Sequence, residues 1–292
     1  MRYRIRHITE YKYADRVSYC YNLAHMTPRT TGRQTCHTSR VEASPIAVSG
    51  HLREDYFGNT AFHFEIQKPH RELVITATSE VETRPQTGGI SLDMGLTCAE
   101  VLRQMRNPAT GDVLLAREYQ MDSAMIKAAP ELKAFAEDLF EPDRPLLNAV
   151  SALTDRIFTE FEYSPLATTI ATPLSEVMAS RKGVCQDFAH LQIACLRSLG
   201  FAAKYVSGYI ETLPPEGQEK MVGADATHAW LSVYSPEEGW FEFDPTNNTM
   251  AGEQHIITAW GRDFYDVTPL RGVIFGGGTD PVMGVSVDVA RI

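Results

Sequence analysis

The sequence predicts an α+β protein, because strands and helices occupy separate stretches of the chain. Residues 1–85 have the alternating pattern of short strands, residues 130–200 have helical periodicity, and β-rich segments return after residue 201. Runs of strands followed by runs of helices are typical of α+β folds, whereas strict alternation would indicate a parallel sheet. The chain of 292 residues is long enough for two domains of ordinary size.

The overall charge and hydropathy exclude several classes of protein. With 27 Lys and Arg against 37 Asp and Glu, the net charge is −10, which disfavours general nucleic-acid binding. No run approaches the roughly 18 apolar residues of a membrane span. The first residues lack the apolar core of a signal peptide. We therefore expect a cytoplasmic protein, or one given without its targeting segment, that has no nucleic-acid or membrane partner; its oligomeric state is not predicted.

Residues 1–85 predict an N-terminal antiparallel β-sandwich domain. Tyr3, Ile5 and His7 alternate with Arg and Thr, the period of two of a strand with one buried face. Further strand-like segments follow at intervals of about 8–15 residues. Turn residues separate them at Thr31-Gly32, Ser44-Pro45, Gly58-Asn59 and Lys68-Pro69. Short strands at this spacing are typical of small sandwiches. The stretch contains no catalytic cluster.

Residues 86–144 are predicted to be a helical connector, beginning with a linker at 86–90, and residues 145–292 to be a core with a C-terminal β extension. Pro130 and Pro145 can each open a helix, the second one running to Tyr163 with an apolar residue every three or four positions. Residues 171–184 are expected to be a loop. The central helix follows at 185–199, and Gly200 is a natural stop. Strands are expected from Phe201 onward.

The five cysteines do not form a disulfide framework, because their number is odd and they are widely scattered. No CxxC pair is present, so a structural zinc site is not expected. An acidic, oxygen-rich calcium loop is absent as well. We predict no metal and no cofactor, and we expect most of the cysteines to be buried.

Cys185 differs from the other cysteines because it is at the predicted start of the central helix. A helix N-terminus offers free N–H groups and a partial positive charge, which favour the nucleophilic thiolate over the thiol. Gly183, two residues earlier, would let a substrate backbone approach closely. The competing interpretation is a buried helix cysteine, and Cys195, in the middle of the apolar stripe, fits that interpretation.

His228 and Asp244 lie on two consecutive predicted strands. The turn Pro236-Glu237-Glu238-Gly239 is nearly midway between them, so an antiparallel hairpin would bring the two side chains together. A carboxylate there would orient the imidazole and stabilise its charged form. Each residue also has a structural interpretation: His228 could be a satisfied sheet histidine, and Asp244 could start a turn before Pro245.

Three motifs that carry these residues resemble the bacterial transglutaminase-like family, a branch of the papain-like cysteine enzymes. They are GVCQDFAHLQIACLRSLGFAAKYVSGY, DATHAWLSVY and GWFEFDPTNN. In that family the cysteine opens the central helix, the histidine precedes Ala-Trp and the aspartate precedes Pro-Thr, matching Cys185, His228 and Asp244. The segment HIITAWGRDFYDVTPLRGV resembles the end of the family's core, and DYFGN at residues 55–59 resembles its N-terminal β-domain.

The resemblance implies an enzyme with a Cys-His-Asp triad that transfers acyl groups from amide bonds of proteins or peptides through a cysteine thioester. Hydrolysis, as in a cysteine protease or amidase, is the favoured outcome; the alternatives are cross-linking to an amine or a non-catalytic peptide-binding scaffold. The resemblance also suggests Tyr163 as an oxyanion donor, although packing at a helix end would equally explain it. His190, on the central helix, is interpreted as structural. The loop 213–225 would shape the cleft.

Overall fold

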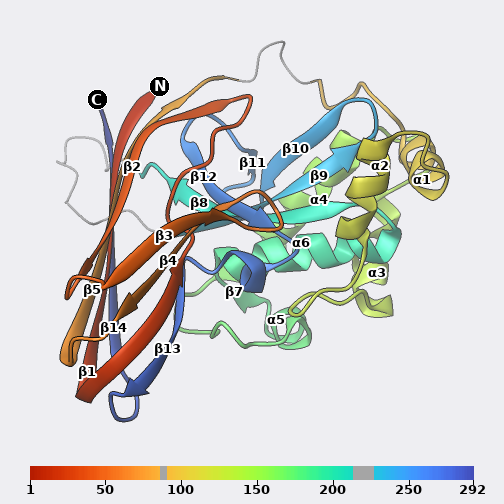
Figure 1. Ribbon diagram of the computed structural model, residues 1–292. Helices are drawn as coiled ribbons and strands as arrows, with labels where there is room; N and C mark the ends of the chain where they lie inside the picture. The colour runs from red at the N-terminus through yellow and green to blue at the C-terminus, as the bar shows by residue number, and fades with distance from the viewer. Residues whose placement is uncertain (86–90, 213–226) are drawn as a thin grey trace, which may run out of the picture.

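The computed structural model describes residues 1–85, 91–212 and 227–292; the predicted linker at 86–90 and the loop 213–225 lie outside the described residues. A β-domain and an α+β core lie side by side (Figure 1). The predicted α+β class and the N-terminal antiparallel sheet are confirmed.

Two halves that share strand β1 make up the β-domain. Its strands are β1 (Arg2–Ala24), β2 (Gln34–Ser44), β3 (Ser49–Glu54), β4 (Thr60–Ile66), β5 (His70–Thr83), β13 (Leu270–Gly276) and β14 (Val282–Arg291). The first part of β1 lies between β5 and β14, and its last part lies between β4 and β13, all antiparallel. Phe64 from β4 and Ile75 from β5 are buried in one common cluster, so the halves pack face to face as a sandwich does.

Strand β1 is longer than the sequence pattern predicts. It runs for 23 residues, with a register shift between Lys12 and Val17 where the separate strands were expected to meet. The predicted alternation is confirmed, since Tyr3, Ile5 and His7 are all buried. Because one strand passes through both halves, it ties them together covalently.

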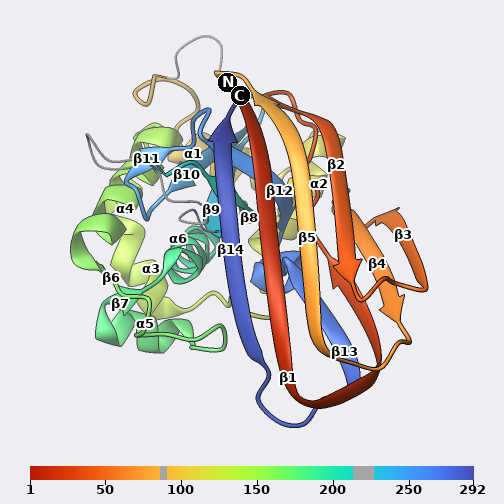
Figure 2. The same ribbon diagram turned by 90° about the vertical axis from the view of Figure 1, so that its left-hand side faces the viewer.

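The predicted boundary of the C-terminal region is wrong. We expected 145–292 to be one core with its own β extension, but β13 and β14 pair with β1 in the N-terminal domain, as Figure 2 shows. The alternation in 282–291 indicates a strand, but it does not say which sheet edge the strand completes. The backbone N–H and C=O groups of β1 that face away from β5 and β4 need hydrogen-bond partners, and β14 and β13 supply them.

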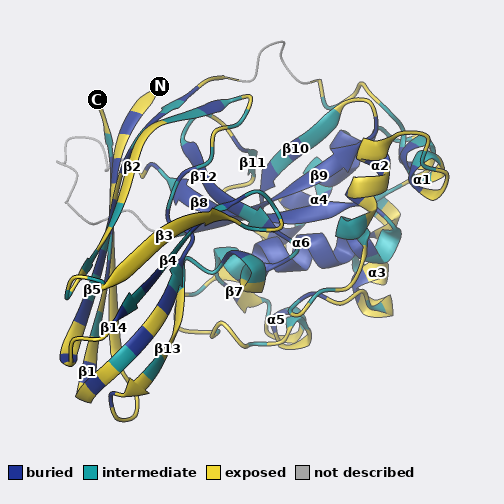
Figure 3. Ribbon diagram, viewed as in Figure 1, coloured by how far each residue is buried: buried dark blue, intermediate teal, exposed yellow. Residues whose placement is uncertain are grey.

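The core is an antiparallel sheet with helix α6 (Cys185–Leu199) packed on one face. Its strand order is β11-β10-β9-β8-β12, and α6 contacts β8 and β9. Figure 3 shows α6 as the most buried helix, at the centre of the core. The strands are β8 (Ala203–Ile210), β9 (Thr227–Ser235), β10 (Gly239–Asp244), β11 (Thr249–Met250) and β12 (His255–Gly261). The other helices are α1 (Cys98–Arg106), α2 (Gly111–Ala116), α3 (Pro130–Ala136), α4 (Leu146–Glu160) and α5 (Leu174–Ser180), with 3₁₀ turns at Arg117–Gln120, Glu137–Leu139 and Phe264–Val267.

Three expectations for the helices need correction. The segment 86–144 contains the expected helices α1 and α3, but its apolar side chains enter the same cluster as α6, so it is part of the core rather than a connector. The helix opened by Pro145 ends at Glu160 instead of Tyr163, because Glu162–Tyr163 forms a short strand, β6, parallel to β7 (Lys182–Gly183). The expected loop 171–184 contains α5.

Amide side chains of the β-domain fix it to the core. The Asn59 side chain donates to the carbonyl of Trp260 and accepts from its N–H, each at 2.9 Å. Gln34 makes the same pair of bonds with Ile257, each at 2.8 Å. Arg29 lies over the Trp260 ring at 3.6 Å. These bonds satisfy backbone groups of β12, the edge strand of the core sheet, and hold the domains in one orientation.

Candidate active site

Cys185 is the first residue of α6, as predicted. The preceding residue, Val184, is extended, and the Asp187 carboxylate accepts its N–H at 2.9 Å, so Asp187 caps the helix. The side chain of Cys185 is half-buried, whereas Cys20, Cys98 and Cys195 are buried. The helix therefore begins with its thiol at the surface of a hollow.

Gly183 has a different role from the one expected. A Cβ at this position would lie 2.9 Å from the Cβ of Asp187 and 3.1 Å from the Phe188 ring. The glycine therefore lets β7 pass close to the first turn of α6, which places Cys185, and it does not face an approaching substrate.

The His228 imidazole connects Cys185 to Asp244. Its Nε2 lies 2.7 Å from Asp244 Oδ2, and the ring shares a further hydrogen bond with the Cys185 thiol, for which Nδ1 remains. Burial opposes the charged ring, but hydrogen bonds and charges from Asp244 and Cys185 outweigh it and raise the pKa of His228 to about 10. The structure thus brings together the three side chains predicted from the sequence.

Asp244 is fully buried and accepts hydrogen bonds from three side chains. Besides His228, they are His255 Nε2 at 3.0 Å and Asn247 Nδ2 at 2.6 Å. Burial opposes the negative charge, yet these donors lower the pKa of Asp244 well below its usual range. Its Oδ1 also accepts the N–H of Thr246, so the residue starts a turn and holds His228 at once.

Sequence reasoning missed His255 and Asn247 as members of the site. His255 is buried, and its Nδ1 accepts the N–H of Gly252 at 3.1 Å. The ring proton is therefore on Nε2, which donates it to Asp244. The signal was available, because Asn247 follows the Asp-Pro-Thr motif directly and His255 is the first residue of the next β-rich segment.

The same three residues, His228, Asp244 and His255, are the group in the described parts of the chain with the spacing of metal ligands. Their donor atoms lie within 4.8 Å of one another. Each nitrogen that faces Asp244 already shares a proton with the carboxylate, so a cation would have to displace both protons. The donor set fits a hydrogen-bonded relay better than a metal centre.

His190 has a structural environment, as predicted. It is buried in α6, and its Nε2 accepts the N–H of Phe264 at 3.1 Å. Burial lowers the pKa of His190 to about 4, which keeps the ring neutral. It is not a rival base for Cys185.

Tyr163 lies beside Cys185 at the end of β6. It pairs with Gly183, and its ring lies 6.4 Å from that of Phe188. The side chain is 52% exposed, so packing uses only part of it. Tyr163 and Cys185 line the same two hollows.

Those two hollows meet at Cys185 and His228. One has a volume of about 400 Å³, and the β-domain forms its far wall with His7, Thr9, Tyr11, Met283 and Val285. The other, of about 780 Å³, extends past Glu211, Asn247 and Gln254. The cleft thus lies where the two domains diverge, and both domains contribute side chains.

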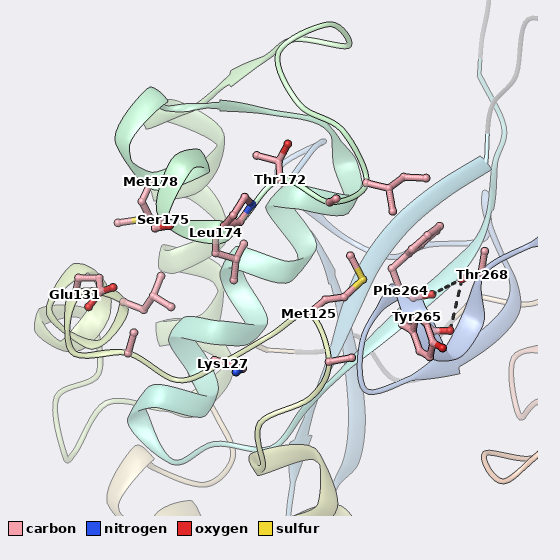
Figure 4. A pocket seen from close by; sticks show the side chains of 16 residues that line it. Met125, Lys127, Glu131, Thr172, Leu174, Ser175, Met178, Phe264, Tyr265 and Thr268 are labelled. Carbon is pink, nitrogen blue, oxygen red and sulfur yellow. Dashed lines mark hydrogen bonds between the residues drawn. The ribbon is translucent and has the colours of Figure 1, made fainter. Parts of the chain in front are cut away.

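A third hollow adjoins the first through shared lining residues, Ile170, Phe264 and Thr268. Figure 4 shows Leu174 on one side of it, Phe264 with Tyr265 on the other, and Met125 between them. Its lining is mostly apolar. The space open to a ligand therefore continues beyond the cysteine.

Comparison with known proteins agrees with this arrangement. Residues 3–82 match the bacterial transglutaminase-like N-terminal region, and residues 133–245 match the transglutaminase-like superfamily. An uncharacterized protein of Mycobacterium tuberculosis is 40% identical over 294 residues, covering 99% of this chain and 92% of the relative. A protein-glutamine gamma-glutamyltransferase of Pseudomonas aeruginosa is 30% identical over 125 residues, 40% of this chain and 18% of that protein.

The fold is also found among solved structures. A candidate cysteine protease from Cytophaga hutchinsonii superposes with a TM-score of 0.76 at 21% identity, covering 100% of this chain and 91% of that one. Among the described residues, no helix is long and apolar enough to cross a membrane. With both its regions matched in order and a relative similar along its whole length, the chain belongs to the transglutaminase-like superfamily.

Proposed function

We propose that this protein is a thiol enzyme that transfers acyl groups from amide bonds of peptides or proteins, with water as the usual acceptor. The observation that carries the proposal is the hydrogen-bonded chain from Cys185 through His228 to Asp244, open to a cleft at its cysteine end. A nucleophile, a base and a group that orients the base are the parts such chemistry needs.

In the first step the Cys185 sulfur attacks the amide carbonyl carbon, and the C–N bond breaks as His228 gives its proton to the leaving amine. The product is a thioester on Cys185. His228, now neutral, takes a proton from water, and the resulting hydroxide displaces the thiolate and releases the acid. The raised pKa of His228 favours a charged ring at neutral pH, which is the proton donor that the first step requires.

The developing oxyanion needs donors close to the thiol. The backbone N–H of Cys185 is in the first turn of α6, where amides lack helical partners and point toward incoming negative charge. Tyr163, exposed in the same hollows, is our choice for the second donor. A Tyr163→Phe variant keeps the packing against Phe188 and removes only the hydroxyl.

Water is favoured over an amine because, among the described residues, neither hollow offers a free carboxylate to hold a lysine ammonium. Among the described residues, Glu211 is the one acidic side chain lining them, and it is already paired with Arg291 at 2.6 Å and with Tyr3 at 3.0 Å. Cross-linking remains the second candidate, supported by the name of the Pseudomonas relative.

A peptide library incubated with and without a primary amine, and read by mass spectrometry, tests the proposal. We expect new acids or cleaved peptides in both samples and none with Cys185→Ala. Stable amine adducts as the main product would favour cross-linking. If Cys185 reacts no faster than a free thiol with a small alkylating agent, and no product forms, the scaffold interpretation is correct.

A further inference from the structure

We propose that an extended peptide substrate binds as an added strand beside β14, at the outward-facing backbone groups of Met283 and Val285, with its acyl group at Cys185. This inference rests on the proposed function and deepens it, because it names how the substrate is held. Strand addition supplies affinity through the main chain, and pockets for alternate side chains supply specificity.

The first observation is the direction of the backbone groups of β14. Ile292 N–H donates to the carbonyl of Arg2, so even-numbered residues of β14 make the bonds to β1 in this antiparallel register. The N–H and C=O groups of Met283 and Val285 therefore point away from β1. Within the part of the chain that the structure describes, β14 pairs with β1 alone in the sheet.

The second observation is that this edge borders the cleft. The side chains of Met283 and Val285 line the same hollow as Cys185 and His228. Figure 2 shows β14 at the margin of the β-domain sheet, on the side of α6. Farther along, Val287 and Val289 pack against Tyr209 and Ile256 of the core, so the edge opens where the two domains separate.

The third observation is the chemical character of the edge. Proteins protect exposed edge strands with charges, as β2 does with Arg40 and Glu42 and β3 does with Arg53 and Glu54. Residues 282–287 of β14 carry no charge, although Val282, Met283 and Val285 are 68%, 54% and 49% exposed. An unprotected apolar edge beside a nucleophile is expected where pairing is the function.

The wall behind the edge indicates which peptides fit. Thr9, Tyr11 and His7 of β1 continue the same face, and burial lowers the pKa of His7 to about 4, so the ring is neutral. We therefore expect an extended, uncharged segment rich in β-branched residues next to the acylated position.

Alkylation of Cys185 by chloroacetyl-peptides tests the inference without assuming which amide is the natural substrate. The sulfur–carbon bond forms as chloride leaves, and mass spectrometry measures the rate at Cys185. The probes are chloroacetyl-Thr-Val-amide and an eight-residue chloroacetyl peptide of Thr and Val ending in Lys for solubility. We expect the longer probe to react about tenfold faster, because several main-chain hydrogen bonds add up.

The variants Val285→Pro and Val285→Ala form a matched pair. Both lose the valine side chain, but only proline removes the outward N–H, and an edge strand tolerates proline at such a position. The advantage of the long probe should fall by about threefold or more in Val285→Pro relative to Val285→Ala. Equal advantages in the two variants would overturn the inference.

N-methylation of the probe provides a test on the unaltered protein, should the proline variant not fold. When the amides of the probe are methylated one at a time, methylation at every second residue should slow the reaction, because a paired strand has a period of two. The absence of this period would contradict strand addition. If a second copy of this chain pairs with β14 instead of a peptide, the protein should be a dimer. Val285→Pro should then dissociate that dimer and leave the alkylation rates of the probes unchanged. If chloroacetamide itself shows no preference for Cys185, the proposed function fails; if it does and the long probe has no advantage, only this inference fails.

Discussion

Helix α6 has a cysteine and a histidine, Cys195 and His190, in its buried middle. At its first turn Cys185 meets another histidine, His228 of β9, whose pKa is shifted in the opposite direction from that of His190. In the middle, burial raises the pKa of Cys195 to about 12 and lowers that of His190 to about 4, so both side chains are neutral. At the first turn, His228 is buried as well, yet its pKa is raised. The difference is Asp244, which compensates a charged ring that burial alone would discharge.

The comparison shows that residue type does not decide chemistry. The pKa of a buried imidazole is raised here where a carboxylate bonds to it directly, as Asp244 does to His228. Asp244 is itself held by His255 and Asn247. At His190 the buried Asp263 carboxylate acts only through its charge, which burial outweighs, and Nε2 accepts a backbone N–H instead of bonding to a carboxylate. The two environments should therefore respond differently to mutation, to alkylation and to pH.

The largest expected effect is on activity. His228→Ala should lower the rate of acyl transfer by about 10²–10⁴-fold or more, since it removes the proposed proton donor and base. His190→Ala should instead lower the thermal midpoint and leave the rate per folded molecule within a few fold. Comparable losses of activity in the two variants, measured on a reactive ester, would remove the distinction.

Alkylation should distinguish the two cysteines of α6. At pH 7.5, iodoacetamide should label Cys185 about a hundredfold faster than Cys195, which burial keeps as an inaccessible thiol. The same burial raises the pKa of Cys98 to about 11 and also raises those of Cys20 and Cys36. Peptide mapping that finds Cys195 labelled first would contradict the assignment.

Asp244→Asn should cost less activity than His228→Ala, because it weakens the orientation of the ring without removing it. The double variant should be little worse than His228→Ala alone, since residues that act as one unit are not additive. If the two losses multiply in kcat/KM on any reactive ester, Asp244 is a turn residue and His228 has another partner.

His255 should act as a positioning residue through Asp244. We expect His255→Phe to reduce kcat by about tenfold with little change in KM, because one buried hydrogen bond to the carboxylate is lost. The alkaline limb of the pH–rate profile, set by the raised pKa of His228, should move to higher pH, because Asp244 loses a competing donor and acts more strongly on His228. His255→Gln can still donate an N–H, so its kcat and its alkaline limb should be closer to those of the unaltered protein. The same pH–rate profile in His255→Phe and His255→Gln would indicate only a packing role for His255.

The smallest effect should be on stability, with opposite signs at the two histidines. His190 stays neutral in the folded protein, so between pH 6.5 and about 4 the unfolded chain binds a proton that the folded chain does not, and stability falls as the pH falls. His228 holds its proton, so its contribution is full below pH 6.5 and is lost as the pH rises toward 10.

Urea unfolding across this range should show each effect as a change in the free energy of unfolding with the sign given above. His190→Gln should flatten the acid side only, and His228→Gln the alkaline side only. A change on the opposite side in either variant would mean that the folded protein shifts that histidine's pKa in the other direction.

Local sequence patterns predicted those parts of the site whose residues lie close together within a single motif. Cys185 could be found from its position at a helix start, and the hairpin turn at Glu237 and Gly239, both with positive φ, confirmed how His228 and Asp244 meet. The first turn of α6 was predictable because its signals are a few residues apart.

The features that the sequence did not predict depend on pairing between distant segments. Nothing in residues 282–291 specifies that their partner is β1, and nothing in His7 specifies that it faces a cysteine 178 positions later. Short elements such as β6 and α5 were missed because tertiary bonds, for example Glu162 N–H to Arg181 at 2.8 Å, override their weak local preference. The cleft wall therefore required the structure.

The pairing of β14 with β1 also sets an order of events during synthesis on the ribosome. The chain emerges from its N-terminus, so Cys185 leaves the tunnel nearly a hundred residues before Met283 and Val285 do. β1 exists from the start but has an open side until β14 arrives. A ribosome that stalls before residue 282 would hold a folded helix and a thiol with no substrate wall. Under the proposed binding mode, the nascent protein would lack its substrate-binding edge until β14 is in place.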